Sequence, residues 1–373
     1  MAACGADTGV TEVDAVVLGA GPAGATVALN LAPFRRVLVL ERRSRPAARI
    51  GESLPGAARR LLTDMGLWEG FLSDGHLPCF ARRSAWGGAE PVEADSTRDP
   101  DGHGWHLDRA RFEARLRATA VARGAMLLSP VRVGAVERRG AGWRVAWSRG
   151  GQREEEARAR VLIEARGRVS RPQAAFGTVR LVADRLVCGW VAGREGTGGV
   201  RGVTHTEAEP EGWWYTAPLP GGRRVLALHT DSDLPAATDA RRSPTLVARA
   251  LRHAGLGPVL RHTAFDMAAR PGFCAAHGCR LDRPAGEGWF AVGDACLALD
   301  PLSSQGLLNA LYTGLAAAEA ADRFLSGDHV AGEQYGQSVR AIWDCYRRNL
   351  EAWYALERRW RDKPFWRRRA GPV

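Results

Sequence analysis

Lysine is nearly missing from this chain. Lys363 is the single lysine among 373 residues, yet the formal net charge is +11, so arginine supplies almost all of the positive charge. A basic protein of this kind favours an acidic partner or a phosphate-bearing ligand. No nucleic-acid-binding motif accompanies the charge, and we therefore expect no nucleic acid partner.

Other absences narrow the class of the protein. No stretch is long and apolar enough to span a bilayer, and residues 1–13 lack the basic and apolar regions of a signal peptide. The seven cysteines are scattered, which fits a reducing cytoplasm better than a disulfide framework. Cys274, His277 and Cys279 are close in sequence, but their spacing matches no common zinc pattern. We expect a cytoplasmic protein with no metal site and no transmembrane segment.

A glycine-rich turn near the N-terminus carries the strongest positive signal. The apolar run 14–18 predicts a buried strand, and the sequence Gly-Ala-Gly-Pro-Ala-Gly of residues 19–24 follows it. Residues 22–31 have the apolar spacing of a helix, and a second apolar run, 36–40, ends at Glu41. Strand, glycines, helix, strand and acid in this order predict a dinucleotide-binding βαβ unit.

Each residue of this motif has an expected physical role. Gly19 allows a tight turn, Gly21 allows a pyrophosphate to approach the backbone, and Gly24 allows the helix to pack closely on the strand. The helix N-terminus attracts phosphate through its free N–H groups and its dipole. Glu41 stands where an acid would hold a ribose hydroxyl.

A second motif near the C-terminus predicts which dinucleotide binds. The apolar run 289–292 predicts a strand that ends at Gly293-Asp294, and residues 300–306 read Asp-Pro-Leu-Ser-Ser-Gln-Gly before a predicted helix over 305–325. A Gly-Asp pair so far along the chain can reach the ribityl phosphate of a flavin, so we expect FAD. The sequence has no second glycine-rich motif, so we expect no separate NAD(P)H-binding domain. Reduction of the flavin then needs transient docking of NAD(P)H, or reduced flavin supplied by a separate flavin reductase.

The remaining pattern predicts an α/β protein with an inserted sheet. We expect a discontinuous Rossmann-like FAD-binding domain from residues 10–75, 102–180 and 265–330. The β-rich, aromatic stretch 181–233 predicts an antiparallel substrate domain inserted into it, formed by residues 76–101 and 181–264. We expect a C-terminal helical segment over 331–373, with a helix over 334–360. The tail over 360–369 is expected to be solvated, or alternatively to contact a partner or a membrane. Further elements are expected as helices over 57–67 and 110–123, the second capped by Asp108, and strands at 126–128, 131–137 and 161–163.

The motifs together resemble the tryptophan-halogenase-like branch of FAD-dependent monooxygenases. The resemblance covers nearly the whole chain and is carried by the residues 19–24, Glu41, Gly51-Glu52-Ser53, Ala165-Arg166-Gly167, Gly293-Asp294, Pro301 and Gly306. Residues 51–67, 102–109, 212–220, 293–306 and 364–369 are most similar to one subgroup, the maturation flavoproteins of lysine-ε-oxidase and glycine oxidase. These help to build a tryptophan-derived quinone in a partner enzyme. The resemblance implies an FAD domain of the aromatic-hydroxylase (glutathione-reductase-like) type.

Departures from true halogenases disfavour halogenation. The resemblance implies a lysine beside the substrate, but only Arg82 or Arg83 stands near that position, and arginine cannot replace a nucleophilic amine. Ser303 stands where halogenases carry a glutamate. In the halogenase motif Gly-Trp-x-Trp-x-Ile-Pro, which falls on residues 212–218, Tyr215 replaces the second tryptophan and Ala217 the isoleucine.

The function implied is hydroxylation of an electron-rich aromatic ring through a flavin C4a-hydroperoxide formed with dioxygen. We expect the substrate to be a tryptophan side chain of a partner oxidase polypeptide. Three alternatives stay open: hydroxylation of a small aromatic metabolite, reduction of isoprenoid double bonds, and a flavin-bound partner that chaperones an oxidase without catalysis.

The candidate site residues follow from the motifs and the resemblance. Histidines titrate near neutral pH, the helix beginning near Gln305 lends a positive dipole end to the reduced ring, and aromatic side chains can form a wall for an indole. Each group has an alternative without a functional role. The tryptophans could pack in the core, the histidines, including His103, could be structural, and Arg109 could lie on the surface. The cofactor-binding candidates are Gly19, Gly21, Gly24, Glu41, Glu52, Ser53, Arg109, Gly293, Asp294, Gln305 and Gly306. The catalytic candidates are His76, His106, Pro301, Ser303 and Gly306, and the substrate-binding candidates are Trp86, Trp213, Trp214, Tyr215 and Arg83.

Overall fold

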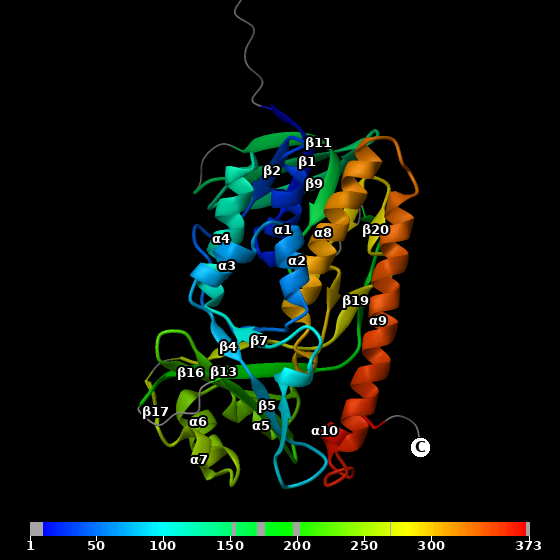
Figure 1. Ribbon diagram of the computed structural model, residues 1–373. Helices are drawn as coiled ribbons and strands as arrows, with labels where there is room; N and C mark the ends of the chain where they lie inside the picture. The colour runs from blue at the N-terminus through cyan, green and yellow to red at the C-terminus, as the bar shows by residue number, and fades with distance from the viewer. Residues whose placement is uncertain are drawn as a thin grey trace, which may run out of the picture.

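The computed structural model describes residues 10–150, 154–168, 170, 176–196, 202–268 and 270–370, with only the backbone of residue 97. Two large sheets lie one above the other along the long axis of the molecule (Figure 1). The upper sheet carries the N-terminal strand, and the long helix α9 (Ala331–Leu356) runs beside both sheets. None of the helices in these ranges combines the length and apolar character that crossing a bilayer demands.

The upper sheet has a parallel core in which the carboxyl ends of the strands meet at one edge. Leu18 pairs with Leu40 on one side and with Glu164 on the other, so the turns after these strands are neighbours. The order is β20-β21-β11-β1-β2-β8, and β10 and β9 extend it by antiparallel pairing. The bounds are β1 Val10–Leu18, β2 Val37–Leu40, β8 Met126–Leu128, β9 Arg132–Arg139, β10 Gly142–Ser148, β11 Glu155–Glu164, β20 Ala285–Gly286 and β21 Trp289–Ala291.

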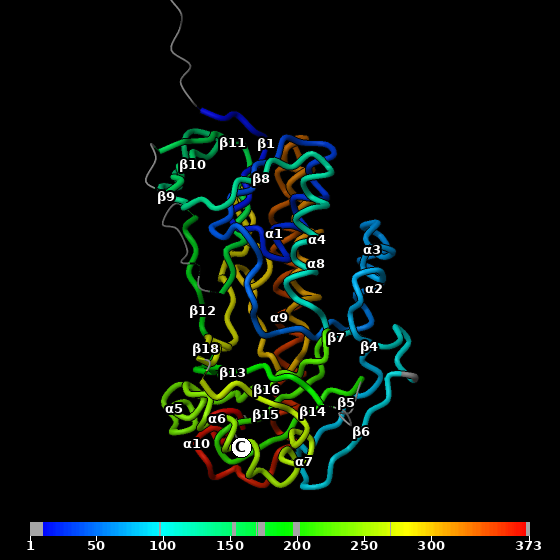
Figure 2. Tube along the Cα trace, turned by 90° about the vertical axis from the view of Figure 1, so that its left-hand side faces the viewer, coloured from blue at the N-terminus to red at the C-terminus, as the bar shows by residue number. Residues whose placement is uncertain are grey.

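Three helices pack around this core, as Figures 1 and 2 show. They are α1 (Pro22–Leu31), α4 (Arg109–Ala122) and α8 (Gly306–Leu325). Asp108 caps α4 by accepting the Arg111 N–H at 3.0 Å, as expected. The single helix expected over 57–67 is shorter and is followed by a second one, α2 (Ala58–Asp64) and α3 (Trp68–Ser73), because Gly66 at φ +65° turns the chain between them.

The lower sheet is mixed, which corrects the expectation of a purely antiparallel sheet: β14 pairs with β5 in parallel. Helices α5 to α7, which the β-rich pattern did not predict, cover one face of this sheet. They pack there against the strand residues Trp214, Leu226 and Leu228. The order is β17-β13-β16-β15-β14-β5-β6, and β18 also pairs with β13. The bounds are β5 Ala81–Ala85, β6 Val92–Asp95, β13 Leu186–Glu195, β14 Val203–Glu209, β15 Gly212–Leu219, β16 Arg223–Asp231, α5 Pro235–Asp239, α6 Ser243–Arg252, α7 Leu256–Leu260, β17 Thr263–Phe265 and β18 Gly272–Ala275.

The opposite face of the lower sheet carries a row of side chains that crosses four strands. Cys188 pairs with His229, His229 pairs with Trp213, and Trp213 pairs with Ala208. Directly opposite residues of antiparallel strands share a face, so these four lie together, and Tyr215 lies two residues further along the same face. Two small sheets lie between the large ones, β3-β7-β4 and β12-β19-β22. Their bounds are β3 Ser53–Leu54, β4 Leu77–Cys79, β7 Gly104–His106, β12 Arg180–Val182, β19 Cys279–Leu281 and β22 Leu297–Ala298.

The C-terminal tail is packed, not solvated, so that expectation was wrong. After α9, the short helix α10 (Pro364–Arg367) buries Phe365 and Trp366 completely against the lower sheet. The Trp366 indole donates to the Glu209 carbonyl at 2.8 Å, and Arg369 pairs with buried Asp231 at 2.7 Å. The basic, aromatic composition of the tail therefore serves intramolecular packing. The α/β class with an inserted sheet and a C-terminal helix is as expected, and the domain bounds given above stay a prediction.

Candidate functional site

The glycine turn has the geometry that each of its glycines predicted. Gly19 has φ +102°, a conformation that side chains disfavour. A Cβ added at Gly24 would lie 2.0 Å from the Gly19 carbonyl oxygen and 2.9 Å from the Ala165 Cβ, so only glycine lets α1 reach the strands. At Gly21, by contrast, no described atom lies within 4 Å of an added Cβ. The turn is tight on the protein side and open on the other.

Glu41 is tied to the same turn. Its Oε2 accepts the Ala20 N–H at 2.8 Å and its Oε1 accepts the Arg43 N–H at 2.9 Å. Arg117 closes this arrangement, because its Nε donates to the Ala20 carbonyl at 2.7 Å while its Nη2 lies 3.6 Å from Glu41. The acid predicted to meet a ribose is thus buried and oriented by the loop that would meet the pyrophosphate.

One face of α4 presents charged side chains toward this region. Arg109, Glu113 and Arg117 recur every four residues, a spacing that puts them on one side of a helix. Arg109 donates to Glu113 at 2.7 Å and also reaches the Gly51 carbonyl, while Arg109 Nε and Glu113 Oε2 have no hydrogen-bond partner in the described part of the chain. Arg109 is therefore not a surface residue, and its face of α4 retains unused donors and acceptors.

The second motif lies at the neighbouring turn. Gly293 has φ +54°, and a Cβ added there would lie 2.7 Å from the Ala23 Cβ of α1. Asp294 keeps about two fifths of its side chain exposed, and its carboxylate lies 3.5 Å from Arg168. Arg168 is held in turn by the carbonyls of His277 and Leu299. The Asp294 carboxylate is fixed by an arginine yet open to a ligand.

The loop after Asp300 leads into α8 with strain at its tip. Ser304 has φ +53°, the one positive φ of a non-glycine residue in the described ranges. Such strain clusters at functional sites. The Ser303 hydroxyl donates to the Asp300 carbonyl at 2.8 Å and accepts the Gln305 N–H at 3.3 Å, so it shapes the loop.

The two helices that begin in this region, α1 and α8, have free N-termini. The N-cap residues are Gly21 for α1 and Gln305 for α8, and neither makes a side-chain capping bond nor is followed by an acid in the first turn. A Cβ added at Gly306 meets no described atom within 4 Å. Uncapped N–H groups and two positive dipole ends suit an anionic ligand.

A chain of hydrogen bonds fixes Asp300 from the C-terminal helix. The Trp213 indole donates to the Tyr354 hydroxyl at 3.2 Å, and that hydroxyl donates to Asp300 Oδ2 at 2.8 Å. The Asp300 N–H donates to the Tyr346 hydroxyl at 2.8 Å. Burial raises the pKa of Asp300 to about 6, although the Leu302 N–H, Arg369 and Tyr354 oppose the shift. The loop beside the predicted ring site is thereby anchored to α9.

Glu52 and Tyr215 meet in the space between the two sheets. Burial raises the pKa of Glu52, and the nearby Tyr215 hydroxyl and Arg109 counteract the rise. Burial and the Glu52 carboxylate raise the pKa of Tyr215. Neither Glu52 Oε1 nor the Tyr215 hydroxyl is aligned with a hydrogen-bond partner among the described residues. Unsatisfied buried polar atoms in native proteins call for an explanation, such as a ligand.

The two histidine candidates lie in different places. His106 is completely buried, its Nε2 lies 2.8 Å from the Thr204 hydroxyl, and burial together with Arg224 lowers its pKa to about 4. It is therefore neutral near pH 7. His76 packs between Phe71 and Phe112, accepts the Asp108 N–H at 3.2 Å and has a pKa lowered by burial. Ser53 pairs with His106 across β3 and β7.

The expected aromatic wall is divided among three environments. Trp86 and Trp213 join Tyr354 and Trp366 in a cluster of edge-to-face rings, and Trp213 stacks on His229 at 3.7 Å between centroids. Trp214 lies on the other face of β15, so the structure does not bring it together with Tyr215. Arg83 pairs with Glu93 at 2.8 Å on the hairpin of β5 and β6.

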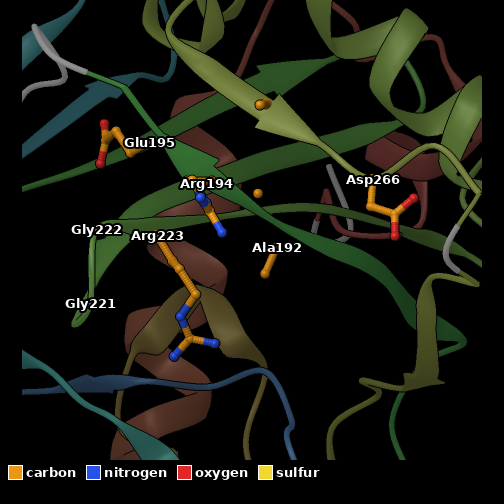
Figure 3. A pocket seen from close by; sticks show the side chains of 9 residues that line it. Ala192, Arg194, Glu195, Gly221, Gly222, Arg223 and Asp266 are labelled. Carbon is orange, nitrogen blue, oxygen red and sulfur yellow. The ribbon is translucent and has the colours of Figure 1, made fainter.

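A separate open hollow lies at the far end of β13 (Figure 3). Its first lining residue on this strand, Ala192, is four residues beyond Cys188, or about 13 Å at 3.3 Å per residue. Its lining contains none of the residues predicted for cofactor or substrate, and consists of residues 192–195, 221–223, Ala264 and Asp266. We therefore place the candidate site between the two sheets.

These residues fit FAD. The cradle at Gly21 has room for a pyrophosphate, Glu41 is oriented for a ribose, and Asp294 is open for a ribityl chain. The strained loop before the free N-terminus of α8 would face the ring. The pyrophosphate, a ribose, the ribityl chain and the ring would each have a matching element near the N-termini of α1 and α8.

Comparison with known proteins identifies the family. A family model described as tryptophan halogenase matches residues 68–371. The chain belongs to the tryptophan halogenase family. LodB of Marinomonas mediterranea, described as an FAD-dependent oxidoreductase, is a relative with 29% identity over 369 residues, which are 95% of this chain and 96% of that protein.

Two solved structures have a fold similar to that of this chain. The myxobacterial chondrochloren halogenase CndH superposes with a TM-score of 0.87 at 24% identity, covering 97% of this chain and 86% of that one. The peptidyl tryptophan dihydroxylase QhpG, essential for tryptophylquinone cofactor biogenesis, superposes with a TM-score of 0.78 at 27% identity, covering 97% and 79%. The expected Rossmann-like, aromatic-hydroxylase type of fold is confirmed. As a tryptophan-halogenase-family flavoprotein the chain is an FAD-dependent oxidoreductase.

The sequence motifs missed three supporting residues. Arg117 could have been found from its spacing to Arg109 and Glu113 on α4. Arg168 directly follows the motif that ends at Gly167. Tyr354 could not have been found, since nothing local links a tyrosine of the last long helix with Asp300.

The two glycines of the turn should separate folding from binding. Gly24→Ala forces a methyl group against the Gly19 carbonyl and should lower the free energy of unfolding by about 1–3 kcal/mol or more. Gly21→Ala should cost at most about 1 kcal/mol, because its methyl group points into open space. If a pyrophosphate fills that space, FAD affinity should fall at least roughly tenfold, or about 1.4 kcal/mol. Urea unfolding and FAD titration measure the two effects, and unchanged FAD affinity in Gly21→Ala contradicts the assignment.

Asp300 should make stability depend on pH. Its pKa of about 6 exceeds the ordinary 3.8, so the folded protein binds more protons between these values. The protonated carboxyl therefore adds about 3 kcal/mol to the free energy of unfolding. This stabilisation is fully present below about pH 4 and is lost as the pH rises through about 6. Asp300→Asn should remove this component of the unfolding free energy measured across the range, whereas Asp344→Asn, on the exposed side of α9, should keep it. Parallel pH profiles for wild type and Asp300→Asn would contradict the shift.

Proposed function

We propose that the protein is a monooxygenase that hydroxylates the ring of a tryptophan side chain in a partner polypeptide, as in the maturation of a quinone cofactor. The proposal is supported by the likeness to QhpG, a peptidyl tryptophan dihydroxylase, over 97% of this chain. It is also supported by the similarity to LodB along the whole chain. The partner would be the oxidase polypeptide that carries the quinone.

The observation that carries this proposal is the position of the only lysine. Lys363 is about half exposed, lies 3.4 Å from Asp362 and comes directly before α10. It belongs to the C-terminal tail and does not belong to the sheet face that carries Tyr215. Near the position expected for a halogenase lysine, Arg83 is paired with Glu93. A halogenase-family chain without such an amine retains the flavin site but lacks the group that relays the halogen.

The chain's own residues would position the cofactor. The turn with Gly19, Gly21 and the N-terminus of α1 would bind the pyrophosphate, Glu41 the ribose, and Asp294 with Arg168 the ribityl chain. FAD, when bound and reduced, supplies the activation of dioxygen. Electrons would come from NAD(P)H docked transiently or from a separate flavin reductase.

The ring site would be shaped by the loop from Pro301 to Gly306. The free N-terminus of α8 would favour negative charge on the ring. The hydrogen bonds from Tyr354 and Tyr346 would keep this loop in place by holding Asp300.

Glu52 and Tyr215 are the groups best placed to handle the substrate's protons. Glu52 Oε1 and the Tyr215 hydroxyl are buried between the sheets, and neither is aligned with a hydrogen-bond partner among the described residues. The Tyr215 hydroxyl could accept the indole N–H proton while it passes its own proton to the Glu52 carboxylate, and the transfer would reverse afterwards. The raised pKa of Glu52 suits proton exchange closer to neutral pH. His106, neutral because burial lowers its pKa to about 4, would act as a hydrogen-bonding group for Thr204 and would not act as the base. Trp86 and Trp213 would support the site from the side of α9.

The test is a reaction with the partner polypeptide. The protein, FAD, NADH, a flavin reductase and air are incubated with the oxidase polypeptide encoded nearest to its gene, with bromide present. We expect a mass gain of one or two oxygen atoms on one tryptophan, located by tandem mass spectrometry, and no bromine. Tyr215→Phe should lower the rate of tryptophan oxygenation roughly 100-fold and leave FAD binding unchanged.

Tyr312→Phe is the matched control, because Tyr312 is exposed on α8 and should leave the rate unchanged. An unmodified polypeptide would reject the proposal, and oxygenation of a free small aromatic instead would favour the alternative substrate class. Bromination would show that the missing lysine is not decisive.

A further inference from the structure

A pair of cysteines faces each other across two strands at the edge of the candidate site. Cys188 of β13 and Cys274 of β18 are direct partners in the antiparallel register. Such partners have Cα atoms about 4.5–5.5 Å apart, within the roughly 4.4–6.8 Å that disulfides span. The strand pairing therefore places the two cysteines within the range that a disulfide can bridge.

The pair continues the row of side chains that faces the upper sheet. Cys188 is paired on its other side with His229, which stacks on Trp213. Glu52 and Arg168 are both near enough to Cys188 to influence its pKa. The dithiol thus lies on the same face as the groups assigned to cofactor and substrate.

The two cysteines have opposite properties. Cys188 is completely buried, and burial followed by its contact with Cys274 raises its pKa, so it stays a thiol. Cys274 is exposed, and hydrogen bonding from Cys188, with help from Arg168 and against burial and Asp294, lowers its pKa to about 7. An exposed thiolate next to a second thiol is the arrangement of a reactive cysteine with a resolving partner.

The other described cysteines lack this combination. Cys79, Cys279 and Cys296 are buried, and burial raises the pKa of Cys296 to about 12. Cys345 is exposed on α9, and its thiol accepts from the Asn349 side chain at 3.5 Å. The dithiol is therefore distinguished by geometry as well as by acidity.

We propose that Cys188 and Cys274 form a peroxide-reactive dithiol that closes to a disulfide between β13 and β18. The Cys274 thiolate attacks hydrogen peroxide, the O–O bond breaks, and hydroxide leaves and takes a proton to become water. The resulting Cys274 sulfenic acid is attacked by the Cys188 sulfur, which displaces a second water as it loses its proton. Two thiols are oxidised and one peroxide is reduced to two waters.

This inference does not rest on the substrate proposed above. The oxygen chemistry of that proposal would nevertheless produce the required oxidant beside the dithiol whenever dioxygen is reduced without substrate. Disulfides of this kind in reducing compartments are transient and redox-sensing. Closure would remove the Cys274 thiolate from beside Arg168 and Asp294, the pair assigned to the cofactor.

The test treats the purified full-length protein with hydrogen peroxide, alkylates the remaining thiols and maps its peptides by mass spectrometry. We expect a peptide pair linked through Cys188 and Cys274 that dithiothreitol separates. Before oxidation, Cys274 should be alkylated several-fold faster than Cys345 at pH 7. Cys345→Ser should form the same link.

Cys188→Ser should stop at a Cys274 sulfenic acid that dimedone traps, which shows the order of the steps even if the disulfide itself destabilises the sheet. Three results would each overturn the proposal: no linked pair at peroxide levels that oxidise Cys345, a link from Cys274 to any other cysteine, or equal alkylation rates at Cys274 and Cys345. The hydroxylation assay does not enter this test, so either proposal can fail alone.

Discussion

The structure depends on the close approach of α1, α8 and the turn at Gly293. A Cβ at Gly314 of α8 would lie 2.7 Å from the Ala23 carbonyl of α1, and a Cβ at Gly293 would lie 2.7 Å from the Ala23 side chain. Only backbone and small side chains fit at this junction. It brings the start of the chain and its last third together, so that the uncapped N-termini of α1 and α8 both belong to the proposed cofactor site.

The second constraint is burial of ionisable groups between the two sheets. Burial raises the pKa of Glu52 and of Asp300 and lowers that of His106. Each shift means that burial disfavours the charged form of the group. The row from Cys274 to Trp213 lies on the same face of the lower sheet as Tyr215, so the proposed oxidation of Cys274 would change the surroundings of the proposed cofactor site.

The sequence predicted the parts of the fold that local chemistry determines. The tight turn at Gly19, the close packing at Gly24 and the Asp108 cap depend on immediate neighbours, and the structure shows each of them. Glu41 lies beside the turn as expected, and its role toward a ribose stays a prediction. The helices α5 to α7 were missed, because the strong β pattern before them concealed a change of period. The aromatic residues were treated as one wall, yet consecutive residues of a strand point to opposite faces, which separates Trp214 from Trp213 and Tyr215.

The C-terminal tail shows what sequence reasoning could not reach. A basic, aromatic stretch has the composition of a surface segment, but its partners Asp231 and Glu209 are more than one hundred residues away. Tyr354 and Asp300 are 54 residues apart, and their contact also depends on the path of α9 past both sheets (Figure 1). Long-range pairing of this kind becomes visible only when the fold is known.

The account rests on FAD lying along α1 and α8, and a crystal structure of the protein with FAD tests this most directly. We predict density for the adenosine half between the Gly19 turn and Glu41, and for the isoalloxazine ring along residues 301–306, with Glu52 and Tyr215 on its open side. A ring located in the hollow lined by Arg194 and Arg223, or an adenosine half away from Gly21, would contradict the account.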